Sequence, residues 1–261
     1  MSISQGVLAF TPDEMMTIAA SRALKNDDVC FVGIGAPSAA CNVARLTHAP
    51  DITLIYESGT IGTAPQVLPL SIGDGELCDT ALTTVSVPEM FRYWLQGGRI
   101  TVGFLGGAQI DRYGNINTTV VGDYARPTVR LPGSGGAAEI AIHARRTLVV
   151  SRLSRRAFPE SVDFVTSPGH RTRAGSRKEL GMPGAGPVRV VTDKGILYAD
   201  ADSGELVLGA VYPDVEIEEI RAGVGWPLRV RERLDRIAPP TRQELTLLRE
   251  VLDPRRLYLK G

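Results

Sequence analysis

The sequence predicts an α/β protein with an open, mostly parallel sheet, helices on both faces and additional hairpin strands toward the C-terminus. Residues 29–32 and 52–55 are short apolar runs of the kind found in strands that are buried on both faces. A helical stretch at about 38–46 joins them, so the three elements form a βαβ unit with parallel strands. Later in the chain, two apolar runs flank Lys194-Gly195, which is typical of a two-residue hairpin turn.

The first helix has a strong start signal. Thr11 can cap it, Pro12 suits its first position, and Glu14 completes a capping box. Apolar residues then recur at helical spacing, at Met16, Ala20, Ala23 and Leu24. We therefore expect an amphipathic helix that ends at about Lys25.

The remaining elements follow in chain order. We expect further strands at 99–105, 147–150, 188–193, 196–200 and 205–211, and further helices at 90–95, 137–142 and 215–222. A second capping box at 241–244 opens a terminal helix. The helix at 90–95 carries aromatic side chains and is interpreted as packed in the core. At this length, the whole chain (1–261) is predicted to form one large domain, with two small domains as the alternative.

Composition narrows the function classes. The chain has 29 basic and 29 acidic residues, so no basic field favours binding to nucleic acid or to an anionic membrane. Its three cysteines are far apart and its three histidines are scattered, so neither a disulfide framework nor a metal site is indicated. No apolar run reaches the roughly 18 residues of a membrane helix and no signal peptide is recognised, so we expect a cytoplasmic protein.

Glu57 is the first candidate for chemistry. It follows the predicted strand at 52–55 and stands before the turn residues Ser58 and Gly59. In open α/β sheets, ligands bind beyond the carboxyl ends of the strands, where this carboxylate lies. The short pattern by itself is more typical of an ordinary solvated glutamate. Two glycine-rich segments later in the chain support a catalytic interpretation of Glu57.

The first of these segments, Gly106-Gly107-Ala108-Gln109-Ile110-Asp111, ends a predicted strand. The second, Gly133-Ser134-Gly135-Gly136, precedes the helix at 137–142 and can let several backbone N–H groups converge on one point. A flexible surface loop is the alternative interpretation of this second segment. The Gln109 amide either contacts a substrate or holds two loops together.

Taken with Glu57-Ser58-Gly59, these segments resemble the B (beta) subunit of class I coenzyme A transferases, the glutaconate type above all, from about Thr11 to Arg256. The resemblance implies a fold of the CoA-transferase/ribose-phosphate-isomerase kind. It also implies that Glu57 is the covalent nucleophile and that a backbone amide of Gly135 or Gly136 stabilises the thioester oxygen. The residues expected to bind CoA or substrate are Gly33, Gly35, Ser58, Gly59, Gly106, Gly107, Gln109 and Gly133.

The resemblance further implies a separate A subunit, in a heterotetramer with two copies of each subunit. Residues 62–89 are rich in Pro, Gly, Thr and Ser and show little periodicity. An irregular stretch of this length is usually functional or a subunit contact, so we expect it near the A subunit. Several arginines at 152–177 could bind CoA phosphates, but solvated loop charge explains them as well, and none is assigned.

The turn Gly33-x-Gly35 allows a second interpretation, because a glycine turn that opens a helix can hold a dinucleotide pyrophosphate. The third glycine of that motif is absent, since Ser38 stands in its place. We therefore interpret the turn as part of the floor of a CoA-ester pocket.

The resemblance implies a ping-pong exchange in which CoA is both substrate and covalent intermediate, with no permanently bound cofactor and no metal. The acids exchanged would be dicarboxylic or carbonyl-bearing. Two alternatives are a relative that hydrolyses or decarboxylates CoA esters and a non-catalytic metabolite-binding subunit. Glu57 favours the transferase, because relatives without transfer typically replace this glutamate and binding alone needs no nucleophile.

Overall fold

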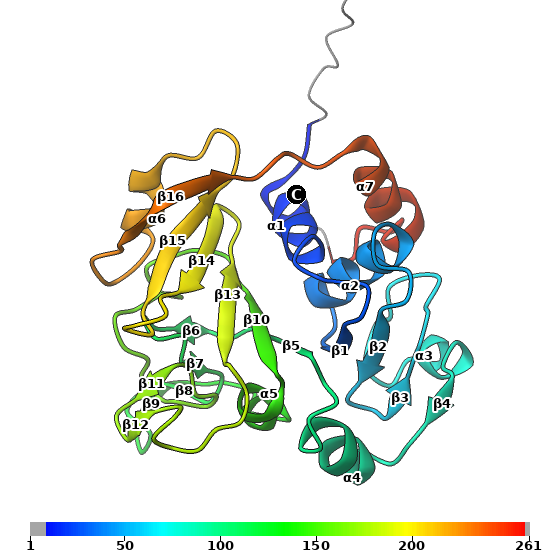
Figure 1. Cartoon of the computed structure of the whole chain (residues 1–261), viewed down its shortest axis with the longest axis horizontal. Coiled ribbons are helices and arrows are strands. Elements are labelled where there is room, and N and C mark those ends of the chain that lie inside the picture. The colour runs from blue at the N-terminus through cyan, green and yellow to red at the C-terminus, as the bar shows by residue number, and fades with distance from the viewer. Residues whose placement is uncertain (1–8, 259–261) are drawn as a thin grey trace, which may run out of the picture.

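The computed structural model describes residues 9–258 and contains a ten-stranded sheet in the order β16-β15-β14-β13-β10-β5-β1-β2-β3-β4 (Figure 1). These strands are β1 (Val29–Val32), β2 (Thr53–Tyr56), β3 (Thr60–Ile61), β4 (Thr83–Thr84), β5 (Val102–Leu105), β10 (Arg146–Val150), β13 (Pro187–Val191), β14 (Gly195–Ala199), β15 (Leu206–Val211) and β16 (Val230–Arg236). The predicted mostly parallel α/β sheet is confirmed.

The five central strands, β2, β1, β5, β10 and β13, are parallel to their neighbours. β14 and β15 extend the sheet on one side as the expected antiparallel hairpin strands, and β3 and β4 extend it on the other. The hairpin turn lies at Asp193-Lys194, one residue earlier than predicted, because Thr192 N–H donates to Gly195 O at 2.9 Å and already closes the ladder.

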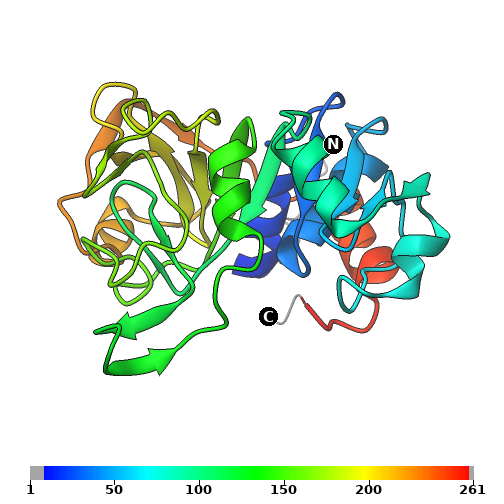
Figure 2. The ribbon, with the colours of Figure 1, turned by 90° about the horizontal axis from the view of Figure 1, so that it is seen from below.

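The helices divide between the two faces of the sheet. They are α1 (Pro12–Ser21), α2 (Ala36–Leu46), α3 (Gly75–Asp79), α4 (Val87–Glu89), η1 (Met90–Leu95), α5 (Ala137–His143), α6 (Ile217–Ala222), α7 (Arg242–Thr246) and η2 (Leu247–Leu252). Figure 2 shows α5 and the α4–η1 helix on one side of the sheet, and α1 and the C-terminal helix on the other.

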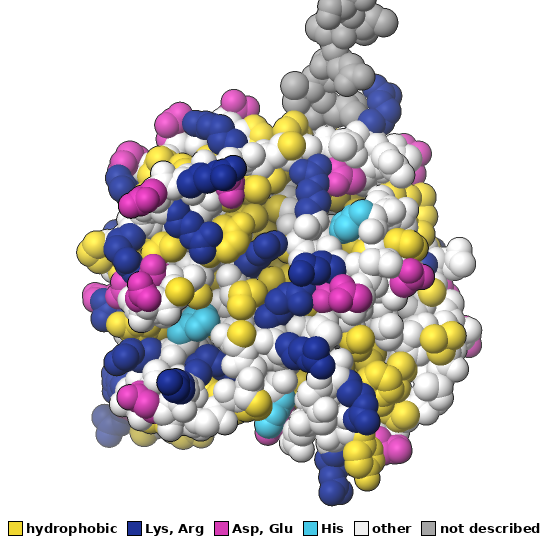
Figure 3. Space-filling view, viewed as in Figure 1, with side chains coloured by type: hydrophobic (Ala, Val, Ile, Leu, Met, Phe, Trp, Pro, Cys, Tyr) yellow, Lys and Arg dark blue, Asp and Glu magenta, His cyan; other side chains and the backbone are white. Residues whose placement is uncertain are grey.

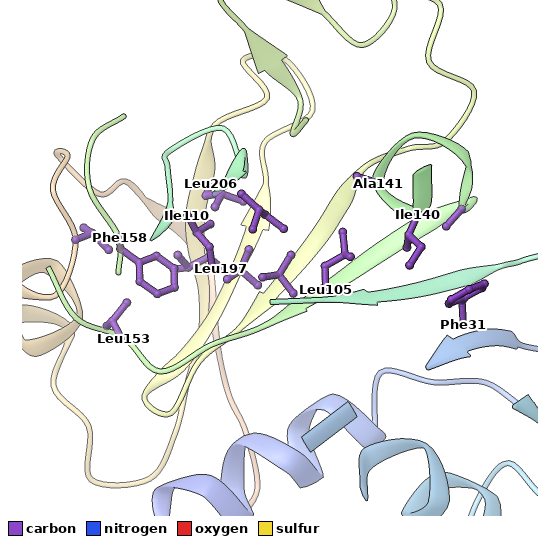
Figure 4. Close-up of a cluster of buried hydrophobic side chains, with 14 of the residues drawn as sticks. Phe31, Leu105, Ile110, Ile140, Ala141, Leu153, Phe158, Leu197 and Leu206 are labelled. Atoms are coloured by element: carbon purple, nitrogen blue, oxygen red, sulfur yellow. The ribbon is translucent and has the colours of Figure 1, made fainter. Parts of the chain in front are cut away.

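Successive side chains of the central strands pack alternately against the helices on one face of the sheet and on the other. Phe31 and Ile55 belong to the cluster that includes Ile140 of α5. Figure 4 shows Phe31, Leu105 and Ile140 within that cluster. The neighbouring residues Cys30 and Leu54 belong to a second cluster, with residues of α2. Burial on both faces explains why these strands read as continuous apolar runs in the sequence.

Both predicted capping boxes are present. Glu14 N–H donates to Thr11 Oγ1 at 3.2 Å, and Thr11 N–H donates to the Glu14 carboxylate at 2.8 Å. Thr241 and Glu244 repeat the arrangement at the start of α7. The first helix ends at Ser21 and not at Lys25, because the chain after it tightens into turns with shorter-range hydrogen bonds.

Three small two-stranded sheets were not predicted. They are β6 (Gln109–Ile110) with β7 (Ile116–Asn117), β8 (Val120–Gly122) with β9 (Pro127–Arg130), and β11 (Arg171–Thr172) with β12 (Gly175–Ser176). The edge strand β16 was also missed, because its charged sequence lacks the apolar pattern of a buried strand. The stretch 62–89 holds the short elements α3, β4 and α4.

Figure 3 shows Lys and Arg side chains mainly over the left and central parts of this view, with Asp and Glu side chains and apolar groups among them. None of the described helices is both long and apolar enough to cross a membrane.

Candidate active site

The carboxyl ends of β1, β2 and β5 meet at one edge of the sheet and border a cavity of about 200 Å³. The chain runs from β1 to β2 through α2, on one face of the sheet. It then passes through η1, on the other face, and enters β5, which pairs with β1 on the side away from β2. Open α/β sheets bind ligands at such a reversal of strand order. The apolar side chains at the cavity are Phe31, Val32, Ile72, Phe104, Leu105 and Ile140.

Glu57 supplies the carboxylate of this cavity. It directly follows β2 and is half-buried. Its carboxylate has no hydrogen bond or ion pair with any residue in the described range 9–258. A half-buried carboxylate without a partner is available to a ligand, since no protein group has to be displaced first.

Tyr56 fixes the end of the strand that carries Glu57. Its side chain is fully buried on the opposite face, and its hydroxyl lies 2.6 Å from Ser38 Oγ of α2. Burial raises the pKa of Tyr56, so the phenol stays neutral and hydrogen-bonded. The backbone next to Glu57 is therefore anchored to α2.

The predicted turn residues Ser58 and Gly59 shape the chain after Glu57. Gly59 N–H donates to Tyr56 O at 3.0 Å, and the Gly59 φ of +106° favours glycine. A Cβ at Gly59 would lie 2.0 Å from Val85 O, so this residue packs against backbone. The Ser58 hydroxyl is buried and has no hydrogen-bond partner among the described residues.

The glycine loop at 133–136 lies against Glu57. A Cβ built on Gly136 would be 3.0 Å from Glu57 Oε1, and one on Gly135 would be 3.9 Å from the same oxygen. Neither glycine N–H donates to a backbone or side-chain acceptor in the described part of the chain. The structure thus brings together a free carboxylate and two free backbone donors that are 78 residues apart or more in the sequence.

The other predicted glycines occupy different places. Gly33 and Gly106 border the cavity. Gly133 holds the start of the glycine loop, because its N–H donates to Thr118 O at 2.8 Å. Gly35 begins α2, and a Cβ there would face Tyr258. Gly107 packs against Ile116 and the backbone of Asn117.

Gln109 is buried in a network of hydrogen bonds. Its Oε1 accepts from Asn117 Nδ2 at 2.7 Å and from Asp163 N–H at 3.1 Å, and its Nε2 donates to Asp163 Oδ2 at 3.0 Å. The amide therefore links two loops in the structure, and it is not among the residues that border the Glu57 cavity.

The apolar side chains at the cavity were not identified as site residues from the sequence, and neither was Phe91 beside it. Ile72 reaches the cavity from the irregular stretch 62–89. Phe91, in the helix that we expected to be ordinary core, places its ring against Gly136. No local pattern marks either residue, because each is brought to the site by contacts that are distant in the sequence.

Two other hollows among the described residues are lined by carboxylates that already have hydrogen-bond partners. Glu14, beside a hollow of about 310 Å³, accepts hydrogen bonds from Arg249, and these and the Thr11 N–H bond outweigh burial, so that the Glu14 pKa is lowered. Asp111, beside one of about 470 Å³, accepts from Asn115, and burial raises its pKa. No cluster of three His, Cys, Asp or Glu side chains within the described residues could hold a metal ion.

Comparison with known proteins identifies the family. A family model described as coenzyme A transferase matches residues 13–223. The chain belongs to the coenzyme A transferase family. The B subunit of 3-oxoadipate CoA-transferase from Pseudomonas knackmussii is 55% identical over 241 residues, which are 92% of this chain and 93% of that protein.

Glutaconate CoA-transferase of Acidaminococcus fermentans is similar in sequence and structure. Its B subunit is 37% identical over 257 residues, 96% of each chain, and its crystal structure matches with a TM-score of 0.90, 34% identity and coverage of 98% of this chain and 99% of that chain. The decarboxylase AibA/AibB matches with a TM-score of 0.82 at 25% identity, over 96% of this chain and 98% of that chain. The predicted resemblance to B subunits of the glutaconate type is confirmed.

Gln109 gives the first testable prediction. Gln109→Leu should lower the free energy of unfolding by about 1–3 kcal/mol, because buried groups of Asn117 and Asp163 lose their partner. The exchange rate per folded CoA-transferase molecule should stay at the wild-type value. Urea unfolding and steady-state kinetics measure the two effects, with Gln96→Leu, which removes an exposed hydrogen bond to Glu139, as the control. An increased KM at unchanged stability would instead favour a direct substrate contact.

Proposed function

We propose that this B subunit carries the covalent step of CoA transfer on Glu57. A Glu57 carboxylate oxygen attacks the thioester carbonyl carbon of an acyl-CoA, and the CoA thiolate leaves. The thiolate then attacks the Glu57 carbonyl of the resulting mixed anhydride and releases the first acid as a carboxylate. Glu57 now carries CoA as a thioester, and a second acid runs the same steps in reverse. The observation that supports this proposal is the unpaired Glu57 carboxylate beside the unpaired N–H groups of Gly135 and Gly136.

Each tetrahedral intermediate places negative charge on the former carbonyl oxygen. Backbone N–H groups that already point at that oxygen stabilise the charge without reorganising during the reaction. Gly135 and Gly136 are the candidate donors. Water must be excluded, because it would hydrolyse the anhydride or the thioester, and the apolar side chains Phe31, Phe104 and Leu105 at the cavity suit that need.

We propose a dicarboxylic acid with an additional carbonyl group as the substrate class. The relative with 55% identity is named for 3-oxoadipate, which has both features. The small cavity at Glu57 suits the reacting end of such an acid. Gly33 and Gly106 remain candidates for contacts with CoA or substrate, since both border the cavity.

Hydrolysis or decarboxylation of a CoA ester remains the second candidate function, since the AibA/AibB decarboxylase has a similar structure. The free Glu57 carboxylate favours transfer, because a covalent acceptor of CoA is what distinguishes transfer from the other reactions. A non-catalytic binding subunit would not need this group.

The Glu57 mechanism predicts a trapped intermediate. Incubation of the heteromer with acyl-CoA and no acceptor acid should leave a thioester on this subunit, which borohydride reduces and peptide mass mapping assigns to Glu57. Glu57→Gln should abolish exchange, because an amide is not a nucleophile. Glu57→Asp withdraws the carboxylate by about 1 Å and should cost about 10² in rate, with slow hydrolysis appearing.

Glu218→Gln is the control for these variants, because this exposed glutamate pairs with Arg221 at the surface. It should exchange CoA at the wild-type rate. Wild-type exchange by Glu57→Gln would show the covalent proposal to be wrong.

The glycine loop generates the next prediction. Gly135→Val should lower kcat by about 10²–10³, the usual cost of losing one donor to an oxyanion, while acyl-CoA still binds. Gly135 has φ +47°, so any side chain also strains the backbone. Gly98→Val is the matched control, since Gly98 has φ +71° and open space around it but lies away from the cavity. Equal kcat in the two variants would contradict a catalytic role for the loop.

We also propose that the A subunit covers part of the stretch 62–89. This stretch exposes five apolar side chains: Val67, Leu70, Ile72, Leu82 and Val87. Exposed apolar groups that gather in one segment are typical of protein contacts. Ile72 also reaches the Glu57 cavity, so the proposed contact would lie beside the site. The proposed assembly has two A and two B subunits.

This assembly predicts that the isolated chain exchanges no CoA and that the chain co-expressed with its A subunit does. Leu82→Lys should weaken co-purification of the two subunits, because Leu82 is 85% exposed in this chain and a charge there costs nothing until the partner covers it. Leu180→Lys, at an exposed leucine outside the stretch, is the control. Full activity of the isolated chain would refute the proposal.

A further inference from the structure

Phe91 lies against the glycine loop, although nothing in the proposed chemistry assigns it a role. A Cβ built on Gly136 would lie 2.6 Å from Phe91 Cζ and 2.9 Å from Cε1. The same Cβ would lie 3.0 Å from Glu57 Oε1. The aromatic ring and the carboxylate therefore converge on one glycine.

Space, and not backbone conformation, requires glycine at position 136. Gly136 has φ −82° and ψ 0°, which any residue can adopt. Gly135 differs, because its φ of +47° favours glycine by itself. At Gly136, the ring edge of Phe91 fills the volume that a side chain would occupy.

The Phe91 ring is held from several directions. It packs against the buried ring of Phe31 on β1, with centroids 5.9 Å apart and planes tilted by 60°. Its helix, η1, has π-helical hydrogen bonding, with Gln96 N–H donating to Phe91 O at 2.8 Å. Met90 and Leu95 anchor the helix in the core with no exposed surface. Such π-helical turns often occur at functional sites because they redirect a side chain.

We propose that Phe91 is a positioning residue for CoA transfer: its ring sets where the Gly136 backbone stands relative to the Glu57 carboxylate. This inference rests on the proposed function of Glu57 and of the glycine loop. With the ring present, the Gly136 backbone cannot shift toward η1, so its position beside the Glu57 carboxylate is defined by the contact with the ring. Without it, the Gly136 N–H moves from the oxyanion position and water gains access to the Glu57 thioester.

The test uses single and double variants of the heteromer. Phe91→Ala should lower kcat by about 10–10², because displacements near 1 Å have costs of that order, while KM for acyl-CoA changes little. Gly136→Ala adds only a methyl group, which collides with the ring and lies 3.0 Å from Glu57 Oε1, and it should lower kcat by about 10²–10³. The double variant gives that methyl group the space left by the ring. If the two substitutions acted independently, their separate reductions of kcat would multiply. The kcat of the double variant should be higher than that multiplied value by about tenfold or more.

Phe91→Leu provides a milder change that keeps most of the apolar volume. It should have a kcat between those of Phe91→Ala and the wild type. The fraction of acyl-CoA hydrolysed rather than transferred should rise from wild type to Phe91→Leu to Phe91→Ala. A ring that only stabilised the helix would not alter this fraction. Tyr93→Ala removes an exposed aromatic side chain from the same helix and should leave both values unchanged.

Wild-type kcat in both Phe91 variants, or multiplicative effects in the double variant, would overturn the positioning role. That result is separate from a failure of the proposed function. If Glu57→Gln were inactive and Phe91→Leu fully active, only the role of Phe91 would be wrong. If Glu57→Gln exchanged CoA normally, the covalent mechanism would be wrong, and with it the positioning role.

Discussion

Parallel pairing of β1 with both β2 and β5 is the constraint on which the rest of the site depends. Parallel strands end at the same edge of a sheet, so the residues that follow β1, β2 and β5 must lie close together. The strand order reverses at β1, which leaves a crevice there that no connection fills. Glu57 is placed in that crevice by its position after β2.

Packing on both faces of the sheet fixes the position of Glu57 and of the glycine loop beside it. On one face, Tyr56 is buried and hydrogen-bonded to Ser38 of α2, which fixes the end of β2. On the other face, α5 packs on β5, where a Cβ at Gly103 would lie 2.3 Å from Ile140. The glycine loop leads directly into α5, so close packing of this helix also locates the loop beside Glu57. Reactive groups placed by packed elements keep their geometry without being hydrogen-bonded to each other.

The paired network around Gln109 contrasts with the unpaired polar groups at the Glu57 cavity. Gln109, Asn117 and Asp163 satisfy one another, whereas the Glu57 carboxylate and the Gly135 and Gly136 N–H groups have no partner within the described chain. Partly buried polar groups cost free energy when they are left unpaired. A protein retains that cost where a ligand supplies the missing partner, and an acyl-CoA thioester with a developing oxyanion would do so.

The sequence by itself determined the central sheet, the two capping boxes and the nucleophile candidate. Each of these is encoded locally: apolar runs form strands, Thr and Glu three residues apart cap a helix, and a carboxylate after a strand lies at the sheet edge. The charged edge strand β16 and the short paired strands escaped prediction, because their pairing depends on partners elsewhere in the chain. Only the tertiary structure could show that Gln109 joins two loops, that Ile72 reaches the cavity and that Phe91 bears on Gly136. These contacts join residues that are distant in the sequence. A local sequence pattern does not indicate which distant side chains meet when the chain folds.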